Sequence, residues 1–130
     1  MMSNKIILDT SALLALINNE IGADIICEQL PHAHMSTVNI AEVTTYLHRN
    51  GYADLEKINN IISLVRPVEF TCEYAMLVGQ IINLTKQYGL SLGDRACLAT
   101  AKILNIPVYT ADKAWNNLTK ALNLQIIQIR

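Results

Sequence analysis

The sequence lacks a surplus of positive charge. Its 130 residues include 10 Lys and Arg against 11 Asp and Glu, which gives a formal net charge of -1 at pH 7. Proteins that attract nucleic acid through their overall charge usually carry a basic surface. Net charge therefore gives no indication of a polyanionic partner, and any such attraction has to come from local features such as bound cations.

Long hydrophobic runs are also missing. The longest uninterrupted apolar segment covers residues 12–17, far short of the roughly 20 residues that cross a bilayer. The amino-terminal stretch begins like a weak signal peptide, but Asp9, Thr10 and Ser11 interrupt its apolar part. We therefore expect no membrane association and no signal peptide.

Cysteines are few and show no disulfide pattern. Cys27, Cys72 and Cys97 are odd in number, widely spaced and set in helical patterns. A small disulfide framework would need an even number at close spacing. We expect three buried, reduced thiols, because free Cys commonly packs as a small apolar residue, and hence a cytoplasmic protein.

Aromatic residues are scarce, at 5%, whereas apolar residues make up 52% and charged residues 16% of the chain. The apolar residues are mostly Ile, Leu, Val and Ala, which suits helices packed on a buried parallel sheet. The length allows one domain with its own core and is too short for two. We therefore expect a single domain over residues 1–130.

Short apolar segments alternate with longer amphipathic ones. We predict strands over residues 5–9, 32–36, 67–70, 107–111 and 124–129. We predict helices over residues 11–19, 22–30, 37–51, 54–65, 73–88, 93–105 and 113–122. Alternation of this kind favours parallel pairing, so the fold class is α/β, a three-layer α/β/α domain with a short parallel sheet. In such sheets the functional crevice lies beyond the carboxyl ends of the strands.

Four acidic residues occupy special places in this pattern. Asp9 and Asp112 each follow a predicted strand, Asp94 opens a helix, and Glu42 lies one turn inside another helix. Each has an ordinary explanation: the three Asp residues can cap helices or favour the helix dipole, and Glu42 can lie on a solvated face. The predicted topology, however, can bring all four to one crevice.

Four carboxylates in one crevice would repel one another, so either some protonate or divalent cations neutralise them. No His or Cys stands at a matching spacing, and oxygen ligands suit Mg²⁺ or Mn²⁺ better than Zn²⁺. Such an ion can hold phosphate oxygens and activate water. The acids Asp9, Glu42, Asp94 and Asp112 are therefore our candidate catalytic and metal-binding residues for phosphodiester hydrolysis.

Four motifs surround these acids in order along the chain: ILDTSALLAL at residues 7–16, NIAEV at 39–43, LSLGDRACLATA at 90–101 and VYTADKAW at 108–115. Together they resemble the motifs of PIN-domain nucleases, and most of all the small VapC-type toxins of bacterial and archaeal toxin–antitoxin pairs. The resemblance covers essentially the whole chain.

The resemblance implies a function and a set of partners. It implies RNA cleavage with Mg²⁺ or Mn²⁺ at the four acids, a homodimer, and inhibition by a cognate antitoxin whose tail enters the active-site groove. It also implies that the hydroxyls of Ser11 and Thr110 support the site, although either can simply cap a turn. Some relatives carry another acid soon after the last Asp, where this chain has Asn116 and Asn117. The number of metal ions bound, one or two, therefore stays open.

Two other readings of the acids compete with the nuclease. One is a catalytically silent PIN-like binding module, which has no physical need for four repelling carboxylates. The other is a phosphate-handling domain with a nucleophilic Asp. That domain needs a second Asp two residues on or a positioned Lys, whereas Asp9 is followed by Thr10 and Ser11. Asn39, one turn before Glu42, either holds that carboxylate, contacts a substrate phosphate or is exposed.

Overall fold

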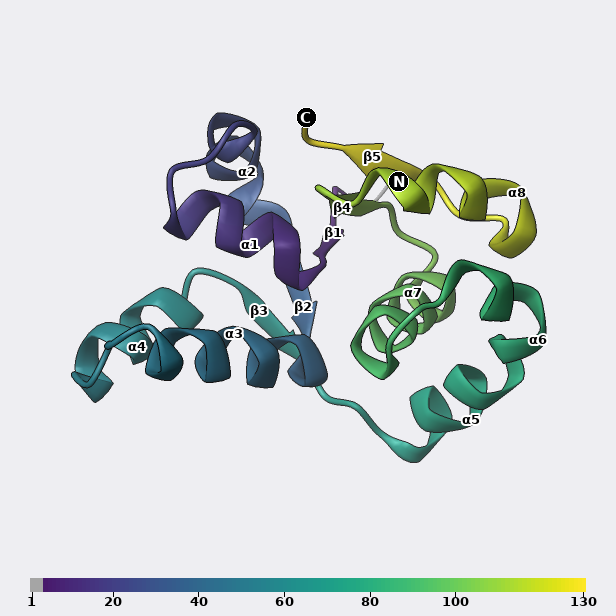
Figure 1. Ribbon diagram of the computed structural model, residues 1–130, viewed down its shortest axis with the longest axis horizontal. Coiled ribbons are helices and arrows are strands. Elements are labelled where there is room, and N and C mark those ends of the chain that lie inside the picture. The colour runs from purple at the N-terminus through teal and green to yellow at the C-terminus, as the bar shows by residue number, and fades with distance from the viewer. Residues whose placement is uncertain (1–3) are drawn as a thin grey trace.

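A five-stranded parallel sheet forms the centre of the computed structural model, which describes residues 4–130 (Figure 1). The strands are β1 (Ile6–Leu8), β2 (Ala33–Ser36), β3 (Arg66–Val68), β4 (Val108–Thr110) and β5 (Ile126–Gln128). Their order is β3-β2-β1-β4-β5, and all four neighbouring pairs are parallel. The first strand is therefore the central one. Asp9 follows it, at the end of the sheet where the parallel strands have their carboxyl ends.

The central strand is buried on both faces. Ile6 and Leu8 pack into one apolar cluster, while Ile7 packs into the other. Side chains alternate between the faces of a strand, so three consecutive apolar residues serve two cores at once. This explains why the strand is a continuous apolar run in the sequence.

Helices cover both faces of the sheet, as the sequence predicts. The α-helices are α1 (Thr10–Ile17), α2 (Ala23–Gln29), α3 (Thr37–Arg49), α4 (Leu55–Ile62), α5 (Cys72–Gln80), α6 (Ile82–Thr85), α7 (Leu92–Leu104) and α8 (Leu118–Leu122). Short 3-10 helices are η1 (Leu30–His32), η2 (Lys86–Tyr88) and η3 (Lys113–Asn117). Helices α1 to α4 lie on one side of the sheet and α5 to α8 on the other (Figure 1), which confirms the three-layer α/β/α class. Within residues 4–130, no helix is long and apolar enough to cross a bilayer.

Two predicted helices are wrong in their extent. The predicted helix over residues 73–88 is broken after α5, because Leu84 N–H donates to the Ile81 carbonyl in a tighter turn and the buried Thr85 hydroxyl donates to the same carbonyl. Ile81 is thereby turned into the core beside α7. The predicted helix over residues 113–122 begins as η3 and becomes α-helical only in α8.

The cysteine prediction is also partly wrong. All three cysteines are free, but only Cys97 is buried, whereas Cys27 and Cys72 are exposed. Cys27 lies away from the inner face of α2, where Ala23 and Ile26 are buried, and Cys72 is the first residue of α5. Helical spacing alone did not identify which face of each helix meets the core.

Candidate functional site

Asp9 leaves the central strand and caps α1. Its Oδ1 accepts the Ala12 backbone N–H at 2.8 Å, and its Oδ2 accepts the Thr110 hydroxyl at 2.6 Å. The Ser11 hydroxyl lies 2.8 and 2.9 Å from the two carboxylate oxygens and donates to them. The cap and the functional interpretation are therefore compatible, because one carboxylate serves the helix end and binds both predicted hydroxyls.

The Asp9 carboxyl has an unusual pKa. Its side chain is buried, and burial raises its pKa to about 6, against the three hydrogen bonds that lower it. The negative charge of Asp94 raises the pKa further. Desolvation penalises the charged form, and a nearby like charge adds to that penalty. A nearby cation would reverse the second effect.

Glu42 projects from α3 towards α1 and α7. Its Oε1 accepts the Thr10 hydroxyl at 2.6 Å and the Asn39 side-chain N–H at 2.9 Å. A Cβ placed on Gly93 would lie 2.6 Å from Glu42 Cδ, which is too close for any real side chain. The carboxylate therefore lies directly over the first turn of α7, where only glycine leaves room for it.

Asp94 lies in that first turn. The Ser91 hydroxyl accepts the Asp94 backbone N–H, and Asp94 Oδ2 accepts the Ser91 backbone N–H at 3.0 Å, which completes a capping box. The capping interpretation is thus confirmed for this residue, and the carboxylate is at the same time fixed beside Gly93. A negative side chain is favoured at this end of a helix.

These contacts connect three of the four predicted acids. Asp9 adjoins Thr10, which binds Glu42, and Glu42 lies over Gly93, which adjoins Asp94. The negative charges of all three acids also raise the pKa of the buried Cys97 thiol, although burial itself is the larger cause. Three independent segments of the chain therefore bring carboxylates to one end of the sheet.

Asp112 is joined to the cluster through its backbone. Its N–H donates to Thr110 Oγ1 at 3.0 Å, and the same hydroxyl donates to Asp9. Its carboxylate is exposed and caps η3, where Oδ1 accepts the Ala114 N–H at 3.0 Å. The structure therefore places Asp112 at the margin of the cluster, with its side chain in the capping position.

The candidate donors are carboxylate oxygens, the type of ligand that hard divalent cations prefer. Within residues 4–130, no group of three His, Cys, Asp or Glu side chains is already arranged to hold a metal ion. In that part of the chain, Glu42 Oε2, Asp94 Oδ1 and Asp112 Oδ2 accept no hydrogen bond and are available as ligands. Mg²⁺ commonly keeps several waters and takes only one or two carboxylates, so it does not require a preformed cage of protein ligands.

A groove of about 560 Å³ opens beside Glu42. Its lining residues come from α3 and from the start of α7: Val38, Ala41, Glu42, Thr45, Tyr46, Arg49, Ser91, Leu92 and Gly93. Arg49 is the basic residue of this set. The groove therefore gives access to one carboxylate of the cluster and is also lined by a positive charge.

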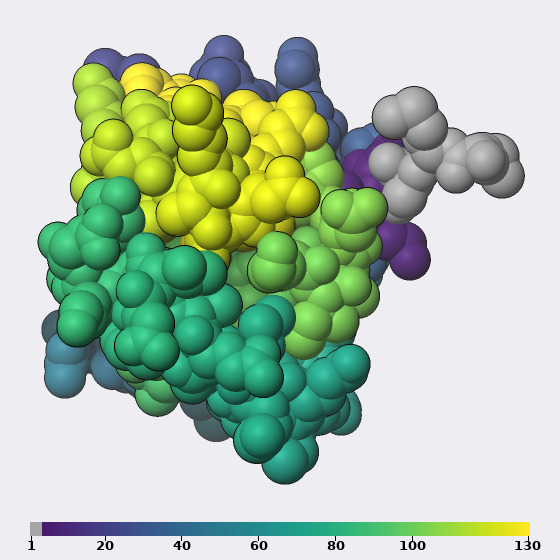
Figure 2. Space-filling model, turned by 90° about the vertical axis from the view of Figure 1, so that its right-hand side faces the viewer, coloured from purple at the N-terminus to yellow at the C-terminus, as the bar shows by residue number. Residues whose placement is uncertain are grey.

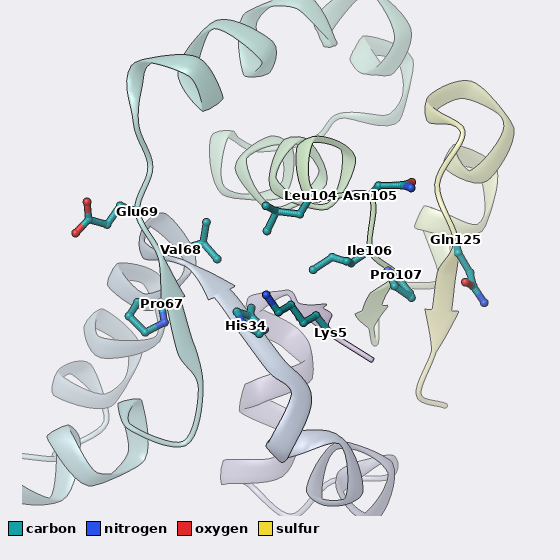
Figure 3. Close-up of a pocket in the computed structure, with 10 residues that line it drawn as sticks. All are labelled: Lys5, His34, Pro67, Val68, Glu69, Leu104, Asn105, Ile106, Pro107 and Gln125. Carbon is teal, nitrogen blue, oxygen red and sulfur yellow. The ribbon is translucent and has the colours of Figure 1, made fainter. Parts of the chain in front are cut away.

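A second cavity, of about 900 Å³, lies between the end of α7 and strands β2 and β3 (Figure 3). Three of its lining residues, Lys5, Pro107 and Gln125, precede strands β1, β4 and β5. It thus reaches the amino ends of these strands and contains none of the four predicted acids among its lining residues.

Two residues of the cluster were not predicted from the sequence. Thr10 supplies a hydroxyl to Glu42, and Gly93 supplies the space that the carboxylate occupies. Thr10 follows Asp9 directly, and Gly93 precedes Asp94, so adjacency to a candidate acid was the available signal. Asn39 proves to be buried and to hold Glu42, which resolves the three possibilities for this residue in favour of the first.

Solved structures share this fold. The chain is similar to one in a toxin–antitoxin complex from Klebsiella pneumoniae, with a TM-score of 0.75, 18% identity and coverage of 97% of this chain and 98% of that one. VapBC2 from Rickettsia felis, bound to a promoter DNA fragment, is similar with a TM-score of 0.74 and 15% identity, over 95% of this chain and 97% of that one. VapBC-1 from nontypeable Haemophilus influenzae is similar with a TM-score of 0.72 and 22% identity, over 95% of this chain and 97% of that one. At these identities the likeness establishes the fold.

A comparison with curated protein sequences gave no match. The family model described as PIN domain, in contrast, matches residues 6–121, which include all four predicted acids and both supporting hydroxyls. This match confirms the resemblance that the four sequence motifs indicate. The chain belongs to the PIN domain family.

Proposed function

We propose that the chain is a divalent-metal-dependent endoribonuclease and the toxin of a type II toxin–antitoxin pair. The observation that carries this proposal is the junction of Asp9, Glu42 and Asp94 through Thr10 and Gly93. The negative charge of Asp94 raises the pKa of Asp9, and like charges this close favour a cation between them. PIN domains of toxins are nucleases as a group, which agrees with this chemistry.

In this proposal Asp9, Glu42, Asp94 and Asp112 hold Mg²⁺ or Mn²⁺, directly or through water. The ion supplies Lewis acidity for a phosphodiester and lowers the pKa of bound water. Ser11 and Thr110 keep the Asp9 carboxylate in one orientation by donating to it. Thr10 and Asn39 do the same for Glu42, and Arg49 contacts a phosphate of the RNA in the groove.

The partners follow from the relatives. One similar structure is named a toxin–antitoxin complex, and another is named a member of the VapBC family of toxin–antitoxin systems, which supports an antitoxin partner for the present chain. We propose in addition a homodimer in the cytoplasm. Sedimentation analysis of the purified chain, alone and with the protein encoded by the neighbouring reading frame, tests both assemblies.

Cleavage of RNA tests the activity. We expect the purified chain to cut labelled RNA with Mg²⁺ or Mn²⁺ and to lose this activity in EDTA. We expect Asp9→Asn, Glu42→Gln and Asp94→Asn each to reduce the rate at least about 100-fold, because each removes a charge that holds the ion. Asp112→Asn should have a smaller effect, on the order of tenfold, because its side chain lies at the margin.

Asp24→Asn is the matched control, since Asp24 is an exposed acid on α2 outside the cluster. It should cut at the wild-type rate. A metal-loaded wild-type chain that cuts no RNA, or cluster variants that cut as fast as Asp24→Asn, would contradict the proposal. Calorimetry that detects no divalent-ion binding would favour the silent binding module instead.

A further inference from the structure

The Asn39 side chain connects two elements of the candidate site. Its Nδ2 donates to Glu42 Oε1 at 2.9 Å and to the Gly93 carbonyl oxygen at 3.0 Å. Asn39 is only 1% exposed, so both bonds are shielded from water. One amide therefore ties α3 to the first turn of α7 at the point where Glu42 meets Gly93.

The orientation of this amide is fixed by its neighbours. Reversing it would place Oδ1 against a carboxylate oxygen and a carbonyl oxygen, neither of which can donate a hydrogen bond. In the observed orientation Oδ1 is buried and has no hydrogen-bond partner in the described part of the chain. A buried acceptor without a partner is unfavourable, so the two contacts of Nδ2 are the interactions that select this arrangement.

Glu42 itself has little else to hold it. The residue is exposed, and its carboxylate is at the end of a flexible side chain. Thr10 and Asn39 both donate to Oε1, and Oε2 accepts no hydrogen bond within residues 4–130. The two donors thus restrict the carboxylate while one of its oxygens stays available, which is the preorganisation that a weak ligand needs.

We propose that Asn39 is a positioning residue whose amide, anchored by the Gly93 carbonyl, holds Glu42 ready to bind a divalent cation beside Asp94. The inference rests on the proposed function, because the cation belongs to that proposal. Asn39 touches neither substrate nor metal in this role. It acts through Glu42, and its loss should weaken ion binding before it affects the fold.

Calorimetric titration of the full, metal-free chain with Mn²⁺ tests the inference. Asn39→Ala removes both hydrogen bonds, and we expect the Mn²⁺ affinity to fall about 10-fold or more, as for other residues that orient a metal ligand. Asn39→Leu keeps the volume and also removes the unpartnered acceptor, so it should fold well and show the same loss. Thermal unfolding of the metal-free proteins verifies that each variant is folded.

Asn18→Ala is the matched control. Asn18 Nδ2 also donates to α3, to the Tyr46 hydroxyl at 3.0 Å, but it does not contact the acids. We expect its Mn²⁺ affinity to stay within twofold of wild type. RNA cleavage by Asn39→Leu should recover as Mn²⁺ is raised, because the substitution weakens ion binding and leaves the acids in place.

The outcomes separate the two proposals. If the wild-type chain binds no Mn²⁺, the proposed function fails, and this inference fails with it. If wild type binds Mn²⁺ and a folded Asn39 variant binds it equally well, the role of Asn39 is refuted while the proposed function stands. A loss of affinity equal to that of Asn18→Ala would refute it in the same way.

Discussion

At the scale of single residues, burial and hydrogen bonding act on Asp9 in opposite directions. Burial raises the pKa of its carboxyl, and donation from Ser11, Thr110 and the Ala12 N–H lowers it. With a net pKa of about 6, most of the Asp9 carboxyl groups are ionised at neutral pH. Burying this negative charge lowers the stability of the fold. The ordinary value of 3.8 applies to the unfolded chain.

This difference predicts the direction of a pH effect. Between the unfolded pKa and the folded one, the native state binds more protons than the unfolded state, so the contribution of Asp9 to stability is present at low pH and falls as the pH rises through about 6. The fall is on the order of 2–3 kcal/mol. Urea unfolding of wild type and Asp9→Asn from pH 4 to pH 8, both without metal, measures it.

The free energy of unfolding of wild type should decline relative to that of Asp9→Asn across this range. Asp24→Asn, which alters an exposed acid, should follow wild type in parallel. A wild-type protein that gains stability relative to Asp9→Asn between pH 4 and pH 7 would show that the folded pKa of Asp9 is lowered instead.

At the scale of helices and strands, the sequence predicted the order and type of most elements. The run at Ile6–Leu8 could be recognised because it is apolar throughout, and the run at Val108–Thr110 because it consists of β-branched and aromatic residues. The break at Ile81 could not, because apolar residues continue through it, and the break depends on Thr85 turning into the core. Propensity carries little information about such tertiary effects.

The candidate site was predictable to a similar extent. The acids and the hydroxyls of Ser11 and Thr110 belong to short local motifs, whereas Thr10 and Gly93 are recognised only by their partners. Thr10 binds Glu42 over a sequence separation of 32, and Asn39 binds Gly93 over one of 54. A local pattern cannot report contacts at such distances, because they are created when α3 packs against α1 and α7.

Two helical glycines give a paired prediction. Gly93→Ala places a methyl group where Glu42 lies, and the flexible carboxylate has to move away. We expect RNA cleavage to fall at least about tenfold, as when a ligand loses its orientation. Stability should change by no more than about 1 kcal/mol, because alanine favours the helix while Glu42 is displaced towards solvent.

Gly79→Ala in α5 is the control, because nothing lies within 4 Å of the added Cβ. It should stabilise the protein by about 0.5–1 kcal/mol and leave cleavage unchanged. Equal cleavage by the two variants would show that the space over Gly93 is unimportant for the site.

At the scale of the whole molecule, the carboxy-terminal residues pack against the connection between α1 and α2. Helix α8 lies beside α6 on one side of the molecule (Figure 2). On another, Gly22 approaches Ile129 so closely that an added Cβ would lie 2.7 Å from its carbonyl oxygen. Arg130 also contacts Glu20 at 3.1 Å, although an exposed ion pair adds little stability.

The packing of the carboxy-terminal residues on the start of α2 should therefore depend on Gly22. This residue has a φ of 100°, and Gly22→Ala combines backbone strain with a clash against Ile129. We expect a loss of about 2–4 kcal/mol in the free energy of unfolding. Gly51→Ala, at a φ of 88° in open space, should cost only about 1 kcal/mol. Chemical denaturation of both variants measures the difference, and equal losses would mean that the contact with Ile129 is unimportant.

The sheet order has a consequence for synthesis on the ribosome. The middle strand β1 is translated well before its neighbour β4, because Asp9 and Thr110 are 101 residues apart in the sequence. A nascent chain therefore holds Asp9 with the Ser11 hydroxyl but without the Thr110 hydroxyl until β4 has been translated. If the chain is an RNA-cutting toxin, this delay leaves the Asp9 side of its site incomplete until β4 joins the sheet.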